Sequence, residues 1–389
     1  MDYRQAALDV YRVYSEDRLA RSRARLLTAW TGVGRPDRIP LVYTGLPVAD
    51  GAPSFDIWEA TCSDEESLAA QFAMIMDRAQ LDDDYVPSLY PGCRQGTLPT
   101  AYGAEEVWSG DHTWVRPILR DAQDIYELPR PDFSRDGVAA EMLERIRFFR
   151  AATAGQMPIQ LLDMQGPLDL ASNLWGTEPL LLAMYENPAA VHELLQRMTD
   201  DFIAYVRLVR EAAEWDLVPI HCMPSVWMPA GLGMALSEDL LAVVSPRLYR
   251  EFGRPYNEQI ARAFGGVVIH SCGSVEHNLA FLADTEGLVG VNLGASETSL
   301  PCVVEAIQGR CAILSHHGVA TCNSLPRLTP EEHIRLCVQL FREKGARGII
   351  LVTPVELSRD EALELSPVAA KLAWIADRQD RDRPRLKLY

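Results

Sequence analysis

The heptapeptide VVIHSCG at residues 267–273 joins a short apolar, β-branched run to two polar side chains and a glycine. Such a run, bounded by turn-forming residues, is typical of a strand buried on both faces of a parallel sheet. Seven further runs share this pattern: IPLVYTG from Ile39, DYVPSLY from Asp84, IQLLDMQ from Ile159, LVPIHCM from Leu217, LVGVNLG from Leu288, AILSHHG from Ala312 and GIILVTP from Gly348. Helical patterns separate them, so we expect a (β/α)8 TIM-type barrel. A doubly wound open sheet is the alternative, because the early strands are weakly marked.

We expect one barrel domain over residues 31–375, with a helical extension at 1–30 and a tail at 376–389. Residues 91–158 are too many for a simple connection and predict an excursion over the barrel mouth. The segment TPEEHIRLCVQLFREKGA predicts a helix whose start is marked by Thr329, Pro330 and acidic first-turn residues.

The composition is that of a globular protein with an acidic surface. Hydrophobic residues make up 48% of the chain, and 37 Lys and Arg against 54 Asp and Glu give a net charge of −17. This charge repels nucleic acid and anionic membranes, so we expect neither as a partner. The amphipathic N-terminus lacks the apolar core of a signal peptide, and no run reaches the roughly 18–20 apolar residues of a membrane span. We therefore expect a cytoplasmic protein whose eight cysteines are reduced thiols.

The ends of the predicted strands are unusually polar. In a parallel barrel these ends meet at the mouth, where the chemistry takes place. From them we select Asp163, His221, Asn292 and His316 as candidate catalytic residues. Asp163 has a second interpretation, as the N-cap of the helix that follows.

His270 and Cys272 are the strongest candidates for a metal site. Residues two apart on a strand point the same way, so an imidazole and a thiolate share one face. Catalytic zinc takes such ligands and keeps one position open. The alternative is a small buried thiol beside a hydrogen-bonded core histidine.

Four stretches in order carry a family resemblance: RPDRIPL (35–41), MQGPLDLASNLWG (164–176), SPRLYREFGRPY (245–256) and HSCG (270–273). Together they resemble the uroporphyrinogen decarboxylase superfamily, closest to the branch that contains corrinoid-dependent methyltransferases. The resemblance covers residues 30–370 and implies a (β/α)8 barrel. It also implies zinc on His270 and Cys272, activating the thiol of a methyl acceptor such as coenzyme M. Cobalamin would serve as the methyl carrier, with a partner corrinoid protein as its expected location, and the sequence leaves open whether the corrinoid is free or bound to protein.

The sequence departs from that branch at the third zinc ligand. The branch has a later cysteine after the last strand, in a Pro-Gly-Cys setting, where this chain has VTPVELS (352–358). We expect Glu356 as the third ligand by its position, or His316 by its strand end. His317, His221 and Cys222 remain open. A carboxylate or histidine in place of a thiolate gives a harder site, which suits an oxygen substrate better than a thiol.

These features favour a zinc-dependent methyltransferase-like enzyme that moves a methyl group between a small substrate and a corrinoid or thiol acceptor. A metal-free decarboxylase or lyase acting on a small carboxylate is one alternative, and a non-catalytic ligand- or corrinoid-binding barrel is another. Porphyrinogen decarboxylation is disfavoured, because VYTGLPVADGAPSFDIWEA (42–60) lacks the arginines that would pair with eight substrate carboxylates. The sequence leaves the substrate open, and whether the chain forms a homodimer.

Overall fold

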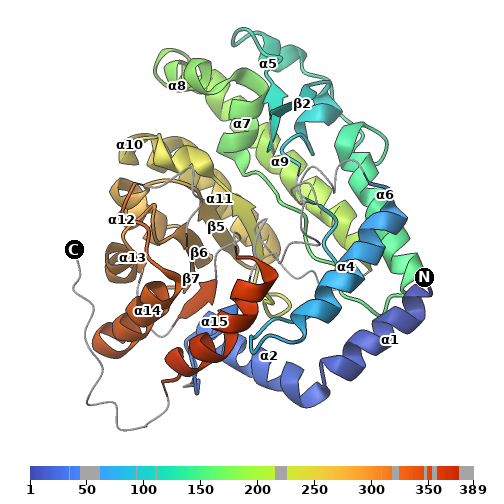
Figure 1. Ribbon diagram of the computed structural model, residues 1–389. Coiled ribbons are helices and arrows are strands. Elements are labelled where there is room, and N and C mark those ends of the chain that lie inside the picture. Colours follow the sequence, from blue (N-terminus) through green and yellow to red (C-terminus); the bar gives the residue numbers. More distant parts are fainter. Residues whose placement is uncertain are drawn as a thin grey trace.

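The computed structural model describes residues 1–34, 36–43, 62–92, 94–109, 112–214, 226–307, 309–317, 324–345, 348–352 and 357–375 (Figure 1). Its centre is a parallel sheet with the strand order β1-β8-β7-β6-β5-β4. The strands are β1 (Leu41–Val42), β4 (Met234–Ser237), β5 (Val267–Ser271), β6 (Leu288–Gly294), β7 (Ala312–His316) and β8 (Ile349–Val352).

Two extended segments close this sheet into a ring. Residues 84–90 adjoin β1, where the Asp84 backbone N–H donates to the Leu41 carbonyl at 2.7 Å. Single parallel bridges then pair Leu89 with Ile159, and Gln165 with Ser237 of β4. The eight members follow one another around a (β/α)8 barrel, as the sequence predicts. An open doubly wound sheet is therefore wrong.

The strands form where the sequence is apolar and β-branched. Every residue of β4, β5 and β8 is buried, as expected for a parallel sheet covered on both faces. Seven of the eight predicted runs contain a strand or ring segment that begins within a few residues of the predicted start, and one of them, Leu288–Gly294, coincides with its run.

The fourth strand differs from the prediction. Its place in the ring is taken by Met234–Ser237, which is not among the eight predicted runs, and the predicted run at 217–223 lies outside the described residues. This strand is only four residues long and contains Met and Ala, which have little strand preference. Gly233 starts it at φ +143°, where a Cβ atom would lie 2.5 Å from the backbone of Gly266. The close approach of two glycine backbones thus places β4 beside β5.

Helices surround the ring, and several begin with an N-terminal cap. Thr329 forms a capping box with Glu332 at the start of α14, as the sequence predicts, and Ser63 and Ser358 form capping boxes at α4 and α15. No helix among the described residues is both long and apolar enough to cross a membrane. Apart from α5 (Asp124–Glu127), the helices that the structure describes after the first strand are α4 (Asp64–Arg78), α6 (Gly137–Ala152), α7 (Pro167–Trp175), α8 (Thr177–Glu186), α9 (Pro188–Ala213), α10 (Pro246–Leu248), α11 (Arg254–Phe264), α12 (Leu279–Ala283), α13 (Leu300–Ile307), α14 (Pro330–Lys344) and α15 (Arg359–Leu372).

Short helical turns complete these elements. A π-helical turn, η3 (Tyr249–Gly253), joins α10 to α11. The 3-10 turns are η1 (Pro99–Tyr102), η2 (Asp239–Ala242) and η4 (Glu276–Asn278).

Two parts of the chain lie outside the alternation of strands and helices. The first is α1 (Tyr3–Val13) with α2 (Glu16–Thr31), and α1 lies beside α4, where the Tyr14 hydroxyl donates to the Ile75 carbonyl (Figure 1). The second is the segment 91–158, which holds η1, the antiparallel hairpin of β2 (Glu105–Ser109) and β3 (His112–Arg116), α5 (Asp124–Glu127) and α6. The hairpin lies near α7 in Figure 1.

Candidate metal centre

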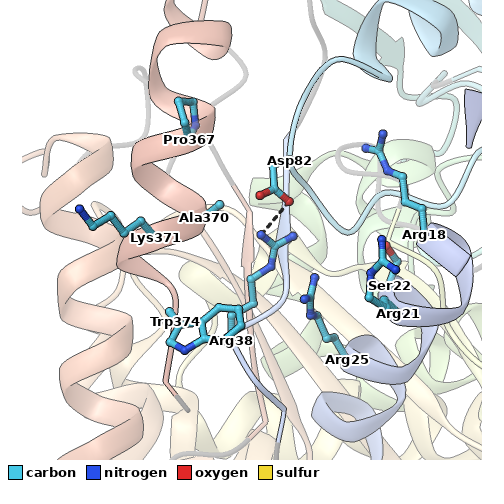
Figure 2. Close-up of a pocket in the computed structure, with 10 residues that line it drawn as sticks. All are labelled: Arg18, Arg21, Ser22, Arg25, Arg38, Asp82, Pro367, Ala370, Lys371 and Trp374. Carbon is cyan, nitrogen blue, oxygen red and sulfur yellow. Dashed lines mark hydrogen bonds and ion pairs between the residues drawn. The ribbon is translucent and has the colours of Figure 1, made fainter. Parts of the chain in front are cut away.

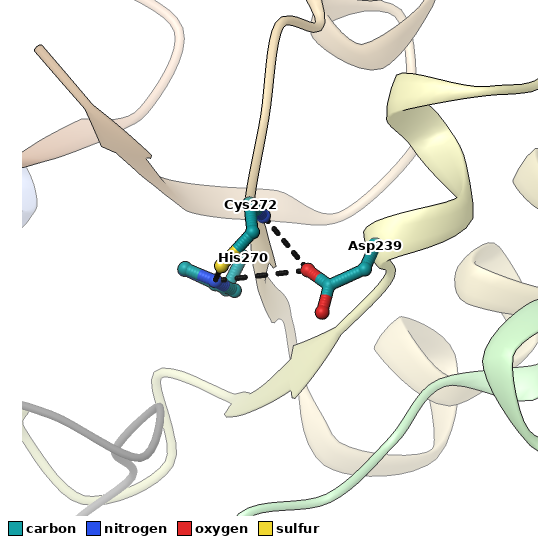
Figure 3. A group of neighbouring side chains, drawn as sticks. All are labelled: Asp239, His270 and Cys272. Carbon is teal, nitrogen blue, oxygen red and sulfur yellow. Dashed lines mark hydrogen bonds and ion pairs between the residues drawn. The ribbon is translucent and has the colours of Figure 1, made fainter. Parts of the chain in front are cut away.

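Three potential metal ligands meet at the carboxyl ends of β4 and β5. His270 lies in β5, Cys272 follows the end of that strand, and Asp239 begins η2 just after β4 (Figure 3). The Nε2 atom of His270 lies 3.2 Å from Sγ of Cys272 and 3.8 Å from Oδ1 of Asp239. These atoms converge as the ligands of a single ion would.

A neighbouring amide fixes the proton on His270. The Nδ2 of Asn292 donates to the Leu314 carbonyl at 3.0 Å, which turns its Oδ1 toward His270. This oxygen lies 2.8 Å from Nδ1 of His270, and because it can only accept, Nδ1 carries the proton. The lone pair of Nε2 then points toward Cys272 and Asp239. A histidine that ligates a metal is held by this arrangement, with its second nitrogen donating to an oxygen.

Hydrogen bonds from the backbone at Asp239 to Asp169 hold this residue in place. Asp169, in the first turn of α7, accepts hydrogen bonds from the N–H groups of Asp239 and Leu240 at 2.7 and 2.9 Å. Asp239 in turn accepts the N–H of Cys272 at 2.7 Å through Oδ1. One carboxylate thus links the end of β4 to the end of β5.

Buried acids surround the cluster. Burial, and secondly the charge of Asp239, raises the pKa of Asp169 well above its usual range. Burial and then the charge of Asp169 raise the pKa of Glu238 in the same direction. Carboxyl groups that raise one another's pKa would be relieved by a nearby cation, so this region favours a positive ion over an anion.

The separations between ligand atoms suit zinc. Tetrahedral zinc with bonds of about 2.0–2.3 Å keeps its ligand atoms roughly 3.3–3.6 Å apart, close to the separations of the His270 nitrogen from its two neighbours. The His270 side chain is 3% exposed, whereas that of Asp239 is 45% exposed. The cluster is therefore closed on the histidine side and accessible on the aspartate side, which leaves room for a fourth, exogenous ligand.

Two further predicted residues, Asp163 and Asn292, lie close to His270 in the barrel. The strand register places Gln165, Ser237, His270 and Asn292 side by side across neighbouring strands. Asp163, on the same segment as Gln165, accepts hydrogen bonds from Ser237 Oγ and Gln165 Nε2 at 3.0 and 3.2 Å. Gly166 occupies the N-cap of α7, so the alternative role of Asp163 as that cap is wrong.

The two adjacent histidines at the end of β7, His316 within the strand and His317 after it, differ in their surroundings. The ring of His316 lies 5.6 Å from that of His270, measured between centroids. His317 has both ring nitrogens engaged, Nε2 with the Leu328 carbonyl and Nδ1 with Nε of Arg327. His316 is therefore placed beside the cluster, whereas His317 is held by its loop.

Three of the selected residues cannot be placed. His221, Cys222 and Glu356 lie outside the described residues, so Glu356 as third ligand stays a prediction. Asp239, which the sequence reasoning did not select, occupies the ligand position beside His270 and Cys272. A signal for it exists in GMALSED (233–239), where a short apolar run ends in two acids.

Comparisons with known proteins identify the family of this chain. The family profile described as uroporphyrinogen decarboxylase (URO-D) matches residues 24–217. The chain belongs to the uroporphyrinogen decarboxylase superfamily. Uroporphyrinogen decarboxylases from Xanthomonas axonopodis pv. citri and Xanthomonas euvesicatoria pv. vesicatoria are each 29% identical to it over 174 residues, which is 43% of this chain and 43% of each relative. The match thus spans less than half the length of these decarboxylases.

A solved structure supports the barrel over most of its length. A methyltransferase from Methanosarcina mazei superposes with a TM-score of 0.65 and 19% identity, covering 90% of this chain and 98% of that chain. Members of the superfamily are enzymes. Asp239, His270 and Cys272 lie beyond residue 217, so the family match does not extend to the metal-ligand cluster.

Proposed function

We propose that the protein is a zinc-dependent methyltransferase-like enzyme of the uroporphyrinogen decarboxylase superfamily, with zinc held by Asp239, His270 and Cys272. The observation that carries the proposal is the hydrogen bond between His270 Nδ1 and Asn292 Oδ1, which leaves Nε2 as a lone-pair donor 3.2 Å from a thiol. Bound zinc supplies Lewis acidity, which lowers the pKa of a thiol or hydroxyl group at its open position.

The residues of this chain perform the other tasks. Asn292 keeps His270 in one tautomer, and Asp169 fixes the backbone that presents Asp239. A single thiolate beside a nitrogen and an oxygen ligand is a harder set than two thiolates, so we expect oxygen or amine methyl donors to react better than thiol acceptors. The methyl carrier is cobalamin, free or on a corrinoid protein.

The charge of the site argues against the decarboxylase alternative. Asp163, Asp169 and Glu238 are all at most 5% exposed and lie around or behind Asp239. A carboxylate substrate would be repelled by these acids, whereas a cation would be attracted to them. A metal-free reaction on a small carboxylate is therefore the weaker candidate.

Metal content tests the site. Inductively coupled plasma mass spectrometry on purified wild type should find about one zinc per chain, as expected of a single three-residue site. Cys272→Ala should lose the zinc, and Asp239→Asn should contain less zinc than the wild type. Cys302→Ala removes an exposed thiol of α13 and should contain as much zinc as the wild type. Zinc that persists in Cys272→Ala and Asp239→Asn would contradict the proposed ligand set.

Methyl transfer tests the reaction. The zinc-loaded protein is mixed with cob(I)alamin and a panel of methoxy and methylamine donors, and formation of methylcob(III)alamin is followed by absorbance. The reverse direction uses methylcob(III)alamin and coenzyme M, which gives the thioether and cob(I)alamin. Turnover that disappears in Cys272→Ala supports the proposal. Chelator-resistant release of carbon dioxide from a small carboxylate would favour the decarboxylase instead.

A further inference from the structure

A cavity lined by cations lies at the opposite end of the barrel. Its volume is about 500 Å³, and Figure 2 shows the side chains that line it. Arg38 precedes β1, and its backbone pairs with that of Trp374 just after α15, so the cavity lies at the amino ends of the strands. The lining residues are Arg18, Arg21, Ser22, Arg25, Arg38, Asp82, Pro367, Ala370, Lys371 and Trp374.

The sequence gathers these cations on one face of α2. Arg18, Arg21 and Arg25 recur at helical spacing, so their side chains project to the same side of the helix. Lys371, in the last turn of α15, also lines the cavity (Figure 2). Four guanidinium groups and one ammonium group thus share the cavity with a single acid, Asp82, in a chain whose net charge is −17.

Ion pairs within the chain neutralise only part of this charge. Arg25 pairs with Asp37 and Asp84 at 2.6 and 2.9 Å, and Arg18 lies 3.3 Å from Asp83. The side chains of Arg21 and Lys371 make no hydrogen bond or ion pair with any residue that the structure describes. Two positive charges therefore remain available at the cavity wall.

Arg38 supplies an independent sign that the cavity takes a ligand. Its side chain is 3% exposed, and Nη1 donates to Asp82 at 2.9 Å. Its Nη2 lies 3.3 Å from Asp84 without a hydrogen bond, and across the described part of the chain Nε also finds no acceptor. Buried donors without acceptors are costly, so an acceptor delivered by a ligand would stabilise this guanidinium.

We propose that this cavity binds an organic dianion of metabolite size, with a phosphate ester or two carboxylates as its charged part. Two uncompensated cations match two negative charges, and guanidinium groups bind such oxyanions through paired hydrogen bonds. The volume lies in the range of about 300–1,000 Å³ that is usual for organic ligands. The indole of Trp374 and the ring of Pro367 provide an apolar wall for the uncharged part. This inference does not depend on the proposed function.

Calorimetric titration with phenyl phosphate, phthalate, inorganic phosphate and phenol tests the proposal at about pH 8, where a phosphate ester carries close to two charges. We expect a dianion to bind and phenol not to. The double variant Arg21→Gln/Lys371→Gln should weaken the affinity by about tenfold or more, since each lost contact to a charge is worth about 1.5–3 kcal/mol. Arg23→Gln, on the same helix but outside the cavity lining, is the matched control.

Two further variants separate the elements of the proposal. Trp374→Ala should weaken binding of phenyl phosphate more than that of inorganic phosphate, because only the former has a ring to place on the indole. Asp239→Asn should bind the dianions with the affinity of the wild type, even if the metal proposal fails. The proposal is overturned if no dianion binds at millimolar concentration, or if the double variant and Arg23→Gln have equal affinities while all variants keep the wild-type circular dichroism.

Discussion

Burial shifts the pKa of a side chain behind the metal-ligand cluster. His333 of α14 is 1% exposed, and its Nε2 lies 2.8 Å from the hydroxyl oxygen of Ser315 in β7. Burial, and then the charges of His317 and His316, lowers the pKa of His333 to about 3. The imidazole therefore remains neutral in the folded protein at pH values where an exposed histidine is charged.

The lowered pKa of His333 makes the free energy of unfolding depend on pH in one direction. As pH falls below about 6.5 the unfolded chain takes up a proton at this histidine, whereas the folded chain does so only near pH 3. The free energy of unfolding should therefore decrease across this interval, by up to about 1.4 kcal/mol per pH unit from His333. Urea denaturation between pH 7 and 4 measures it, and His333→Gln should show a shallower slope. Equal slopes would exclude His333 as the source.

Asn292 offers a second test at this scale, which rests on the proposed metal site. Asn292→Ala removes the acceptor that orients His270, and loss of such a supporting contact typically costs 10–100-fold in metal affinity. Competition with a zinc chelator measures the affinity. Asn292→Asp retains an acceptor for the Nδ1 proton and should remain closer to the wild type. An alanine variant with unchanged affinity would argue against the assigned tautomer.

The sequence predicted most of this cluster from strand periodicity alone. His270, Cys272 and Asn292 follow clear β-branched runs, so their position at a strand end could be inferred. Asp239 has only a weak signal, the short apolar run before it in GMALSED, because that four-residue strand depends on the contact between Gly233 and Gly266, which are far apart in sequence. Residue patterns report local periodicity, and they do not report such a tertiary contact.

At the scale of elements, α7 and β4 approach each other closely at Gly166. Gly166 has an ordinary φ of −73°, so its backbone does not require glycine. A Cβ atom there would lie 2.4 Å from Oε1 and 2.7 Å from Cγ of Glu238, which is fully buried. The glycine is needed for space, because α7 must approach β4 closely for Asp169 to reach the backbone of Asp239.

We expect Gly166→Ala to cost about 1–3 kcal/mol of stability, the usual range for overpacking a core. Urea denaturation of the single variants and of Gly166→Ala/Glu238→Ala measures the coupling between the two positions. The alanine should cost much less once the Glu238 side chain is removed. A cost that is independent of Glu238 would show that the clash is relieved elsewhere.

At the scale of the molecule, the barrel was predictable because eight apolar runs alternate with helices. The order of its ring follows from the chain, with β1 closing against β8. The segment 91–158 was predictable in length but not in content, because the hairpin of β2 and β3 pairs with itself outside the ring. Its strands carry charged and aromatic residues that do not mark a buried strand.

Neighbouring strands of this barrel are joined by unequal numbers of residue pairs, and this determines where the barrel opens transiently. From β4 to β8 each strand is joined to the next by three or more residue pairs, whereas single bridges join residues 84–90 to 159–165 and the latter to β4. Local opening follows the weakest bonding, so backbone amides of the two bridged segments should exchange with deuterium well before those of β5 to β7. Mass spectrometry of pulse-labelled peptides would resolve the two groups. The barrel would then open on either side of residues 159–165, next to Asp163 and Gln165, while β5, which carries His270, stays closed.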